Sequence, residues 1–380
     1  MKITKVDAVE VVVPTHAGRV NSPEFGRVIF DETPKLIFEL HTDARFSGLG
    51  EGPRGWGEAG LRSAVACLKD REIESLCFQE PPLTDLSRDD LFGHENPQRP
   101  HRLLERSFNT YEQLGVHAAL LDLMGKRTGL PISTLLGGKY RDHVAVDMWM
   151  GRMTPADSAR VCSDAKRQGY RGAKFKCALE DDNVERAAAI RDACGEDFKL
   201  TLDPNGRFYR YGEAMPMLRR LAAVGNIGCV EDPFPKGDLA SYRTLRRHGL
   251  FPVALHLGYD APLIDAVRRH ACDFVNLSAT PWDVRRAGEV CWAAGIPTWH
   301  GSGVDLGVIE ALFLHVAAAT KSMSRPSDLF GRTIREHNLI TDPLQPQAGA
   351  VAVPSGAGLG VELDRDALDR YTTRRFSIEL

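Results

Sequence analysis

From about residue 140 onward, short apolar strands alternate with amphipathic helical segments, and this repeat limits the fold more than any other feature of the chain. Apolar residues between the strands have helical spacing, as at Leu263, Ile264 and Val267. Eight such units predict a parallel (β/α)-barrel of the TIM type. A doubly wound sheet is the alternative, but it would not normally need eight units. The predicted strand ends recur every 22 to 30 residues, near Met148, Lys176, Asp203, Glu231, His256, Ser278, His300 and Phe330.

The residues before this repeat have a different pattern of apolar and polar side chains, which predicts a smaller α+β domain. Residues 5–13 alternate between apolar and polar side chains, and residues 36–40 are expected to be the partner strand. Residues 61–130 are rich in helical spacing. Two segments, 15–30 and 48–60, are polar or rich in glycine and are predicted to be loops.

Composition and charge exclude several classes of protein. A length of 380 residues fits one large barrel plus a smaller domain. The formal net charge of −3 gives no basic excess for binding nucleic acid. No apolar run reaches the 18 or so residues of a membrane span, and the N-terminus lacks a signal-peptide cleavage site. The eight scattered cysteines are typical of reduced thiols, so we expect a cytoplasmic enzyme.

Catalytic groups of such barrels project from the carboxyl ends of the strands, and two carboxylates lie at neighbouring predicted ends. Asp203 in TLDPNG and Glu231 in CVEDP each follow an apolar strand. Two carboxylates placed in this way can share a hard divalent cation through oxygen. The alternative is that each residue caps the helix that follows it.

Lysine and histidine residues at two other strand ends indicate acid/base chemistry. Lys174 and Lys176 lie two apart, which places both side chains on one face of a strand. The like charge is expected to lower the ammonium pKa, so that one lysine can act as a general base. His300 ends the seventh strand and is expected to face Lys176 across the barrel. Surface lysines and a histidine satisfied by local hydrogen bonds are the alternatives.

Four motifs in this order resemble the mandelate racemase/muconate lactonizing branch of the enolase superfamily. They are GLPISTLLGGKYRD at 129–142, K-x-K at 174–176, LDPNG at 202–206 and EDP at 231–233. Together with ALFLHVAAAT at 311–320, they look closest to the D-glucarate dehydratase-like subgroup. The resemblance implies abstraction of a proton from the carbon beside a carboxylate, with Mg²⁺ as the cofactor.

The resemblance also implies the division of the chain. Residues 1–128 would form an N-terminal α+β capping domain, residues 129–345 the catalytic barrel, and residues 346–380 a segment that returns to the capping domain. The loops at 15–30 and 48–60 would cover the substrate. Members of the family are commonly homo-oligomers.

Roles for individual residues follow from the same resemblance. Lys176 would be the base on one face of the substrate, with Lys174 beside it near the substrate carboxylate. Asp203 and Glu231 would bind Mg²⁺. His300 would be the acid or base on the other face.

Further residues are implied as substrate contacts. Asn205 would lie close to the metal site. Three arginines of the predicted loops, Arg19, Arg27 and Arg54, would meet a polar acid substrate, although loop arginines are usually only solvated.

Two strand ends depart from the family pattern. The fifth normally supplies a third oxygen ligand, but His256 or Leu257 stands there, and imidazole is a poor ligand for Mg²⁺. Asp260 or water is the alternative. The sixth carries Ser278 rather than an aspartate that orients the histidine or a second lysine, which weakens the cycloisomerase interpretation.

Three functions remain in competition. The first is a hydro-lyase that dehydrates a sugar acid, an aldonate or aldarate, to a 2-keto-3-deoxy acid. The second is an isomerase, a racemase or epimerase of a 2-hydroxy or amino acid derivative. The third is a degenerate barrel that binds an acid without turning it over. Each takes a small-molecule carboxylate as its partner.

Overall fold

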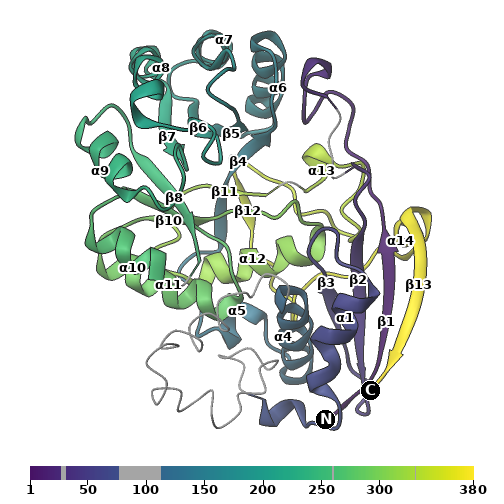
Figure 1. The fold of residues 1–380 in the computed structure, drawn as a ribbon. Coiled ribbons are helices and arrows are strands. Elements are labelled where there is room, and N and C mark those ends of the chain that lie inside the picture. Colours follow the sequence, from purple (N-terminus) through teal and green to yellow (C-terminus); the bar gives the residue numbers. More distant parts are fainter. Residues whose placement is uncertain (27–30, 77–112, 259–260, 330) are drawn as a thin grey trace.

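The structure is a computed structural model that describes residues 1–26, 31–76, 113–258, 261–329 and 331–380 (Figure 1). It contains a four-stranded antiparallel sheet and a curled, mainly parallel sheet surrounded by helices. The predicted (β/α)-barrel with a separate α+β domain is therefore confirmed.

The antiparallel sheet has the strand order β13–β1–β2–β3. Its strands are β1 (Ile3–Val11), β2 (Lys35–Thr42), β3 (Ser47–Glu51) and β13 (Thr372–Glu379). Val6 pairs with Leu40 in the β1–β2 ladder, which confirms the predicted pairing of the first two strands. Alternate residues of these strands are buried against α4 (Leu114–Thr128), whose last turn ends at Gly129 in the left-handed conformation.

Part of the segment 48–60, expected to be a loop, is instead strand β3 followed by α1 (Glu58–Val65). The two glycines of β3 are required by close approach of α4 rather than by a turn. A Cβ atom on Gly48 would lie 2.1 Å from the carbonyl oxygen of Ala119, and one on Gly50 would lie 2.6 Å from that of Gly115. Glycine inside a strand often marks a site where another backbone approaches closely.

The parallel strands follow the order β10–β9–β8–β7–β6–β5–β4–β11. They are β4 (His143–Met150), β5 (Gly172–Lys176), β6 (Lys199–Asp203), β7 (Ile227–Glu231), β8 (Val253–Leu257), β9 (Phe274–Leu277), β10 (Thr298–His300) and β11 (Ser327–Asp328). The backbone N–H of His300 donates to Ser327 Oγ (3.2 Å), which joins the two outermost strands and closes the ring. The predicted ends at Lys176, Asp203, Glu231 and His300 agree with the structure.

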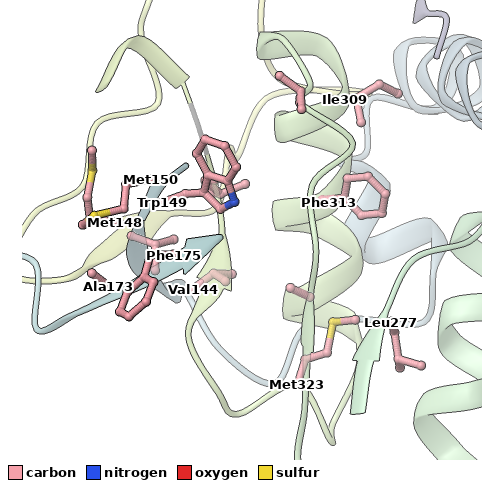
Figure 2. Packing of buried hydrophobic residues seen from close by; sticks show 14 of the residues in the cluster. Val144, Met148, Trp149, Met150, Ala173, Phe175, Leu277, Ile309, Phe313 and Met323 are labelled. Atoms are coloured by element: carbon pink, nitrogen blue, oxygen red, sulfur yellow. The ribbon is translucent and has the colours of Figure 1, made fainter. Parts of the chain in front are cut away.

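Helices follow the strands and cover the outside of the ring (Figure 1). They are α6 (Pro155–Arg167), α7 (Asn183–Cys194), α8 (Tyr211–Val224), α9 (Leu239–Arg247), α10 (Ala261–Arg268), α11 (Pro281–Ala293) and α12 (Gly307–Ala319). Figure 2 shows Met148 and Phe175 from the strands, and Ile309 and Phe313 from α12, within one cluster of buried apolar side chains. Burial of this cluster is the main driving force that holds the helices on the barrel.

The C-terminal segment contacts both parts of the molecule. The antiparallel strand β12 (Ala350–Ala352) pairs with β4 of the barrel. After α14 (Arg365–Tyr371), β13 pairs with β1 of the other sheet, as Figure 1 shows in yellow and purple. The segment 346–380 therefore belongs in part to the barrel.

A buried ionic cluster joins the antiparallel sheet to the barrel. Lys35 of β2 forms ion pairs with Glu51 of β3 and with Asp305, whose Oδ1 lies 3.1 Å from Nζ. Glu51 also accepts hydrogen bonds from the backbone N–H groups of Leu306 (2.7 Å) and Ile309 (3.1 Å), at the start of α12. We name Lys35, Glu51 and Asp305 the domain-joining cluster. All three side chains are buried, so their charges need compensation, which they give one another with a further contribution from the buried guanidinium group of Arg335.

Among the described residues, none of the helices has the length and apolar character needed to cross a bilayer. The seven described cysteines are free thiols, in agreement with the prediction.

Three buried histidines make the stability of the fold sensitive to acid. Burial lowers the pKa values of His117, His300 and His315 to about 4, below the value near 6.5 of an unfolded chain. Between these values the unfolded state binds more protons, so stability is complete above pH 6.5 and decreases as the pH falls toward 4. His117→Leu should remove about 2 kcal/mol of the stability difference between pH 7.5 and pH 5. Urea unfolding at both pH values measures this, with exposed His143→Gln as the unaffected control.

Candidate active site

A cavity of about 580 Å³ opens at the carboxyl ends of the barrel strands. Six of the residues predicted to form the site line it: Arg54, Lys174, Lys176, Asp203, Asn205 and His256. The remaining lining residues are Val20, Asn21, Phe25, Trp149, Gly151, Arg152, Arg207, Asn276, Gly301, Ser302, Gly303, Val304 and Asp328. Side chains that are far apart in the sequence therefore converge here because successive strand ends meet at one rim.

Lys174 lies at the bottom of the cavity, surrounded by carboxylates. Its Nζ is 3.1 Å from Asp203 Oδ2, 2.7 Å from Glu231 Oε2 and 2.7 Å from Asp328 Oδ2. Burial alone would lower the pKa of Lys174, but these three negative charges raise it well above its ordinary value. The expectation that the neighbouring lysine lowers the pKa is therefore wrong for Lys174, whose pKa is raised by these carboxylates instead.

Lys176 lies one step closer to the open cavity on the same face of β5, as period two requires. Its ammonium group forms an ion pair with Asp203 and donates to Asn205 Oδ1 at 2.7 Å. Asn205 adopts a left-handed backbone conformation with φ of 47°. This turn after β6 brings its amide oxygen to Lys176.

Glu231 is fully buried beneath the cavity and is oriented by two residues. Asn276 Nδ2 donates to Glu231 Oε1 at 2.8 Å, and His256 Nδ1 lies 3.7 Å from the same oxygen. Burial, together with the charge of Asp203, raises the pKa of Glu231 to about 8. The cationic side chains around it thus compensate its charge incompletely.

His300 lies outside the barrel wall, so the prediction that it faces Lys176 across the cavity is wrong. Along β10, Trp299 points to the barrel interior beside Lys174 and Cys229, and the next side chain therefore points outward. The His300 ring stacks on Phe313 of α12, and its Nδ1 lies 3.1 Å from the carbonyl oxygen of Leu277. Burial keeps the pKa of His300 at about 4, so the ring is neutral.

The three predicted loop arginines have different positions. Arg54 lines the cavity from the antiparallel-sheet side. Arg19 does not; its Nη1 lies 3.5 Å from Asp164 Oδ2 on α6. Arg27 lies outside the described residues. Of these three predicted substrate contacts, only Arg54 is placed at the cavity.

Sequence reasoning missed several residues of the site. Asp328 ends β11 two residues before the predicted end at Phe330, which lies outside the described residues. Asn276 comes two residues before the predicted end at Ser278, and period two would have placed both on one face. Arg152 and Arg207 follow the ends of β4 and β6 and line the cavity wall.

Residues 157–367 match the family described as enolase C-terminal domain-like, which is more than half of the chain. The chain belongs to the enolase superfamily. The D-galactarolactone cycloisomerase of Agrobacterium fabrum is 26% identical to this superfamily member, covering 97% of the chain and 98% of the relative. The N-succinyl-L-Arg/Lys racemase of Bacillus cereus is 23% identical, with 98% of each covered. The crystal structure of a racemase of that name from the same species superposes with a TM-score of 0.79 at 20% identity, covering 100% of both chains.

The comparisons support the mandelate racemase/muconate lactonizing type within the enolase superfamily. Membership identifies the chain as an enzyme of this superfamily, whose members generally use Mg²⁺ to abstract a proton beside a carboxylate. The relatives named above are isomerases, whereas the predicted dehydratase subgroup is a lyase.

The residues of this enolase-superfamily member fit a divalent cation. Asp203 and Glu231 are buried at neighbouring strand ends and both contact the same ammonium group of Lys174. One ligand atom each from Glu231, Asp232 and His256 also lies within 4.8 Å of the others. Burial, followed by the charge of Asp203, raises the pKa of Glu231, and a divalent cation at this place would favour its ionised form. Asp203 and Glu231 are the carboxylates predicted to hold it, and Asp232 and His256 offer further ligand atoms beside Glu231.

Asn276 is expected to set the orientation of Glu231 in this superfamily member. Outer partners of metal ligands typically contribute about 10–100-fold to metal affinity. Asn276→Ala should therefore weaken binding of a divalent cation about 10–100-fold. Isothermal titration calorimetry measures the change, and Asn21→Ala on the far wall of the cavity serves as the control. Equal affinity in the two variants would show that Asn276 does not orient the ligand.

Proposed function

We propose that the protein abstracts the α-proton of a hydroxylated carboxylic acid with Lys176 and expels the β-hydroxyl group from the same face. The products would be water and a 2-keto-3-deoxy acid, so the enzyme would be a sugar-acid dehydratase. The observation that carries this proposal is the position of Lys176 in the cavity, beside carboxylates suited to a cation and facing a wall whose described residues include no lysine or histidine.

Lys176 would act twice in this reaction. Once its ammonium group has given a proton to solvent, Nζ would take the α-proton, and the electron pair of the C–H bond would pass into the enolate. When the bond between the β-carbon and oxygen breaks, the leaving hydroxide takes the proton from the Lys176 ammonium group and departs as water. The enol that remains then loses its O–H proton and gains a solvent proton at the β-carbon, which gives the 2-keto-3-deoxy acid. The lysine is then neutral again, and no acid on the opposite face is needed.

Stabilisation of the enolate comes from fixed positive charge. The ammonium group of Lys174 remains charged and lies where it can pair with the substrate carboxylate. A divalent cation held by Asp203 and Glu231 would supply further charge to the enolate oxygens. Such interactions accelerate the reaction because they are stronger with the dianionic enolate than with the substrate.

The rest of the cavity is suited to a polyhydroxylated acid. Arg54 and Arg207 bring positive charge, while Asn21, Asn205 and Ser302 bring neutral hydrogen-bonding groups. Arg152 also lines the cavity, but its charge is balanced by Asp181 (Nε–Oδ2 2.9 Å). The name of the Agrobacterium relative refers to a sugar-acid lactone, which supports this substrate class.

Racemisation or epimerisation is the second candidate, because the Bacillus cereus relative is a racemase. That reaction needs a proton donor on the face opposite to Lys176. The wall opposite, formed by Gly301, Ser302, Gly303 and Val304, presents no lysine or histidine among the described residues. The arrangement of the described side chains therefore favours the one-base elimination.

A panel of aldonic and aldaric acids in D₂O tests the proposal. Each acid is incubated with protein and divalent cation, keto product is detected with semicarbazide, and the α-proton is followed by ¹H NMR. The proposal expects keto product. Deuterium incorporation without keto product would establish racemisation instead. No exchange with any acid, in protein shown to bind metal, would support the interpretation as a non-catalytic acid-binding barrel.

A further inference from the structure

The alternation of side chains along β8 determines which residue can reach the metal site. Ala254 packs in the barrel interior with Cys229 and Trp299, whereas Leu255 and Leu257 belong to the large core outside the ring. His256 faces inward with Ala254 and lines the cavity. Among the described residues of this strand, His256 is therefore the only side chain with a ligand atom at the cavity.

The position of the imidazole fits direct coordination. Nδ1 of His256 lies 3.7 Å from Glu231 Oε1. Metal–ligand bonds of about 2.0–2.2 Å place two ligand atoms roughly 3–4 Å apart. The separation seen here is thus already that of two ligands sharing one ion.

Backbone hydrogen bonds on both sides of His256 hold its imidazole group in this place. The N–H of His256 donates to Asp232 Oδ1 at 2.9 Å, and its carbonyl oxygen accepts from Lys236 Nζ. Lys236 in turn lies 3.2 Å from Asp232 Oδ2. These contacts fix the end of β8 without using either ring nitrogen. They also bring Asp232 to Lys236, while one carboxylate oxygen of Asp232 stays within 4.8 Å of ligand atoms of Glu231 and His256.

A ligand set of two carboxylates and one imidazole differs chemically from an all-oxygen set. Carboxylate oxygens suit Mg²⁺, whereas imidazole nitrogen suits first-row transition metals such as Co²⁺, Ni²⁺ and Zn²⁺. We propose that His256 is a direct metal ligand and that it shifts the selectivity of this site from Mg²⁺ toward divalent transition metals. This inference rests on the proposed function for the presence of a metal at Asp203 and Glu231, and it adds the identity of the ion.

The test compares metals and variants without relying on turnover. Any carboxylate site binds Co²⁺ somewhat more tightly than Mg²⁺, so the ratio of the two dissociation constants is compared between proteins. Chelator-treated wild type, His256→Asp and His256→Asn are titrated with each ion by calorimetry. Wild type is expected to have a Co²⁺ to Mg²⁺ preference at least about tenfold greater than that of His256→Asp. His248→Asp, a histidine remote from the cavity, should leave the ratio unchanged.

Electron paramagnetic resonance provides a second test, of whether an imidazole nitrogen is bound directly to the metal. A Cu²⁺-loaded or Mn²⁺-loaded wild-type protein should give electron spin-echo modulation from the ¹⁴N nucleus of one imidazole, and His256→Asn should lack it. Circular dichroism confirms that each variant is folded, and His256→Asn replaces His256→Asp if the latter is not.

The outcomes separate the two proposals. Absence of any divalent-ion binding by wild type would overturn the metal site of the proposed function. Binding without ¹⁴N modulation, or with the same metal preference in wild type and variants, would overturn only the role of His256. A changed preference together with loss of the ¹⁴N signal in the variant would support it.

Discussion

Replacement of Lys176 by alanine should reduce α-proton exchange by about 10²–10⁴-fold, the typical contribution of a general base. The reason is that Nζ of Lys176 is the described amine most exposed to the cavity, while Lys174 is held as a cation by three carboxylates. The measurement is loss of the α-proton signal in D₂O, with the acid that gives the highest turnover in the panel.

The fold should tolerate this change because Lys176 lies at the rim of the barrel rather than in its core. Circular dichroism and urea unfolding check this directly. Lys199→Ala provides a matched control, since Lys199 starts the neighbouring strand β6 at the opposite end of the barrel. Exchange by Lys176→Ala at the rate of Lys199→Ala would exclude Lys176 as the base.

Replacement of Lys35 by methionine should destabilise the protein by about 3–5 kcal/mol, because removing one partner leaves buried charge uncompensated. Glu51 and Asp305 would then lose their shared ammonium partner in the interior, and buried Arg335, whose charge acts on both carboxylates, would compensate only part of the loss. The midpoint of urea unfolding measures the loss. The variant should also bind substrate more weakly, since Asp305 Oδ2 accepts from Ser302 Oγ (2.9 Å) and Gly303 N (2.7 Å), and both residues line the cavity.

The matched control for this prediction lies on the same sheet. Lys5 of β1 forms an exposed ion pair with Asp7, and surface pairs contribute roughly 0–1 kcal/mol. Lys5→Met should therefore change stability by no more than about 1 kcal/mol. A similar loss in both variants would show that the domain-joining cluster contributes no more than a surface pair.

The barrel and much of its polar floor were predictable from sequence because both follow from repeated local patterns. Apolar strands at regular spacing predict parallel units, and the last residue of a strand lies at the rim whatever the details of packing. Asp203, Glu231 and Lys176 end their strands as predicted. The period of two then places Lys174 on the same face as Lys176.

Whether the side chain of His300 points into or out of the barrel was not predictable in this way. Its strand has only three residues, Thr298, Trp299 and His300, and each of the last two is a plausible interior residue. The structure places the larger Trp299 inside the ring, where it packs with Cys229 and Ala254. Which side of so short a strand points into the barrel depends on the volumes of the interior side chains of the other strands. The sequence of this strand does not specify those volumes.

Asp328 and Asn276 were missed for a related reason. β11 has two residues and offers no periodic pattern, so its end could not be placed to within two residues. Asn276 precedes the end of β9 and is uncharged, whereas the candidate residues were mainly charged or titratable side chains at strand ends. Its importance depends on Glu231, a residue 45 positions earlier in the chain.

The pairing of β1 with β13 has a consequence for how the protein is made. Lys5 pairs with Glu379, so the strand at one edge of β1 is translated only after every strand of the barrel has been translated. During synthesis β1 therefore keeps one row of N–H and C=O groups without its native partner, which is a hazard for aggregation. We expect nascent chains halted before residue 372 to depend on chaperones, and the completed chain to be released from them.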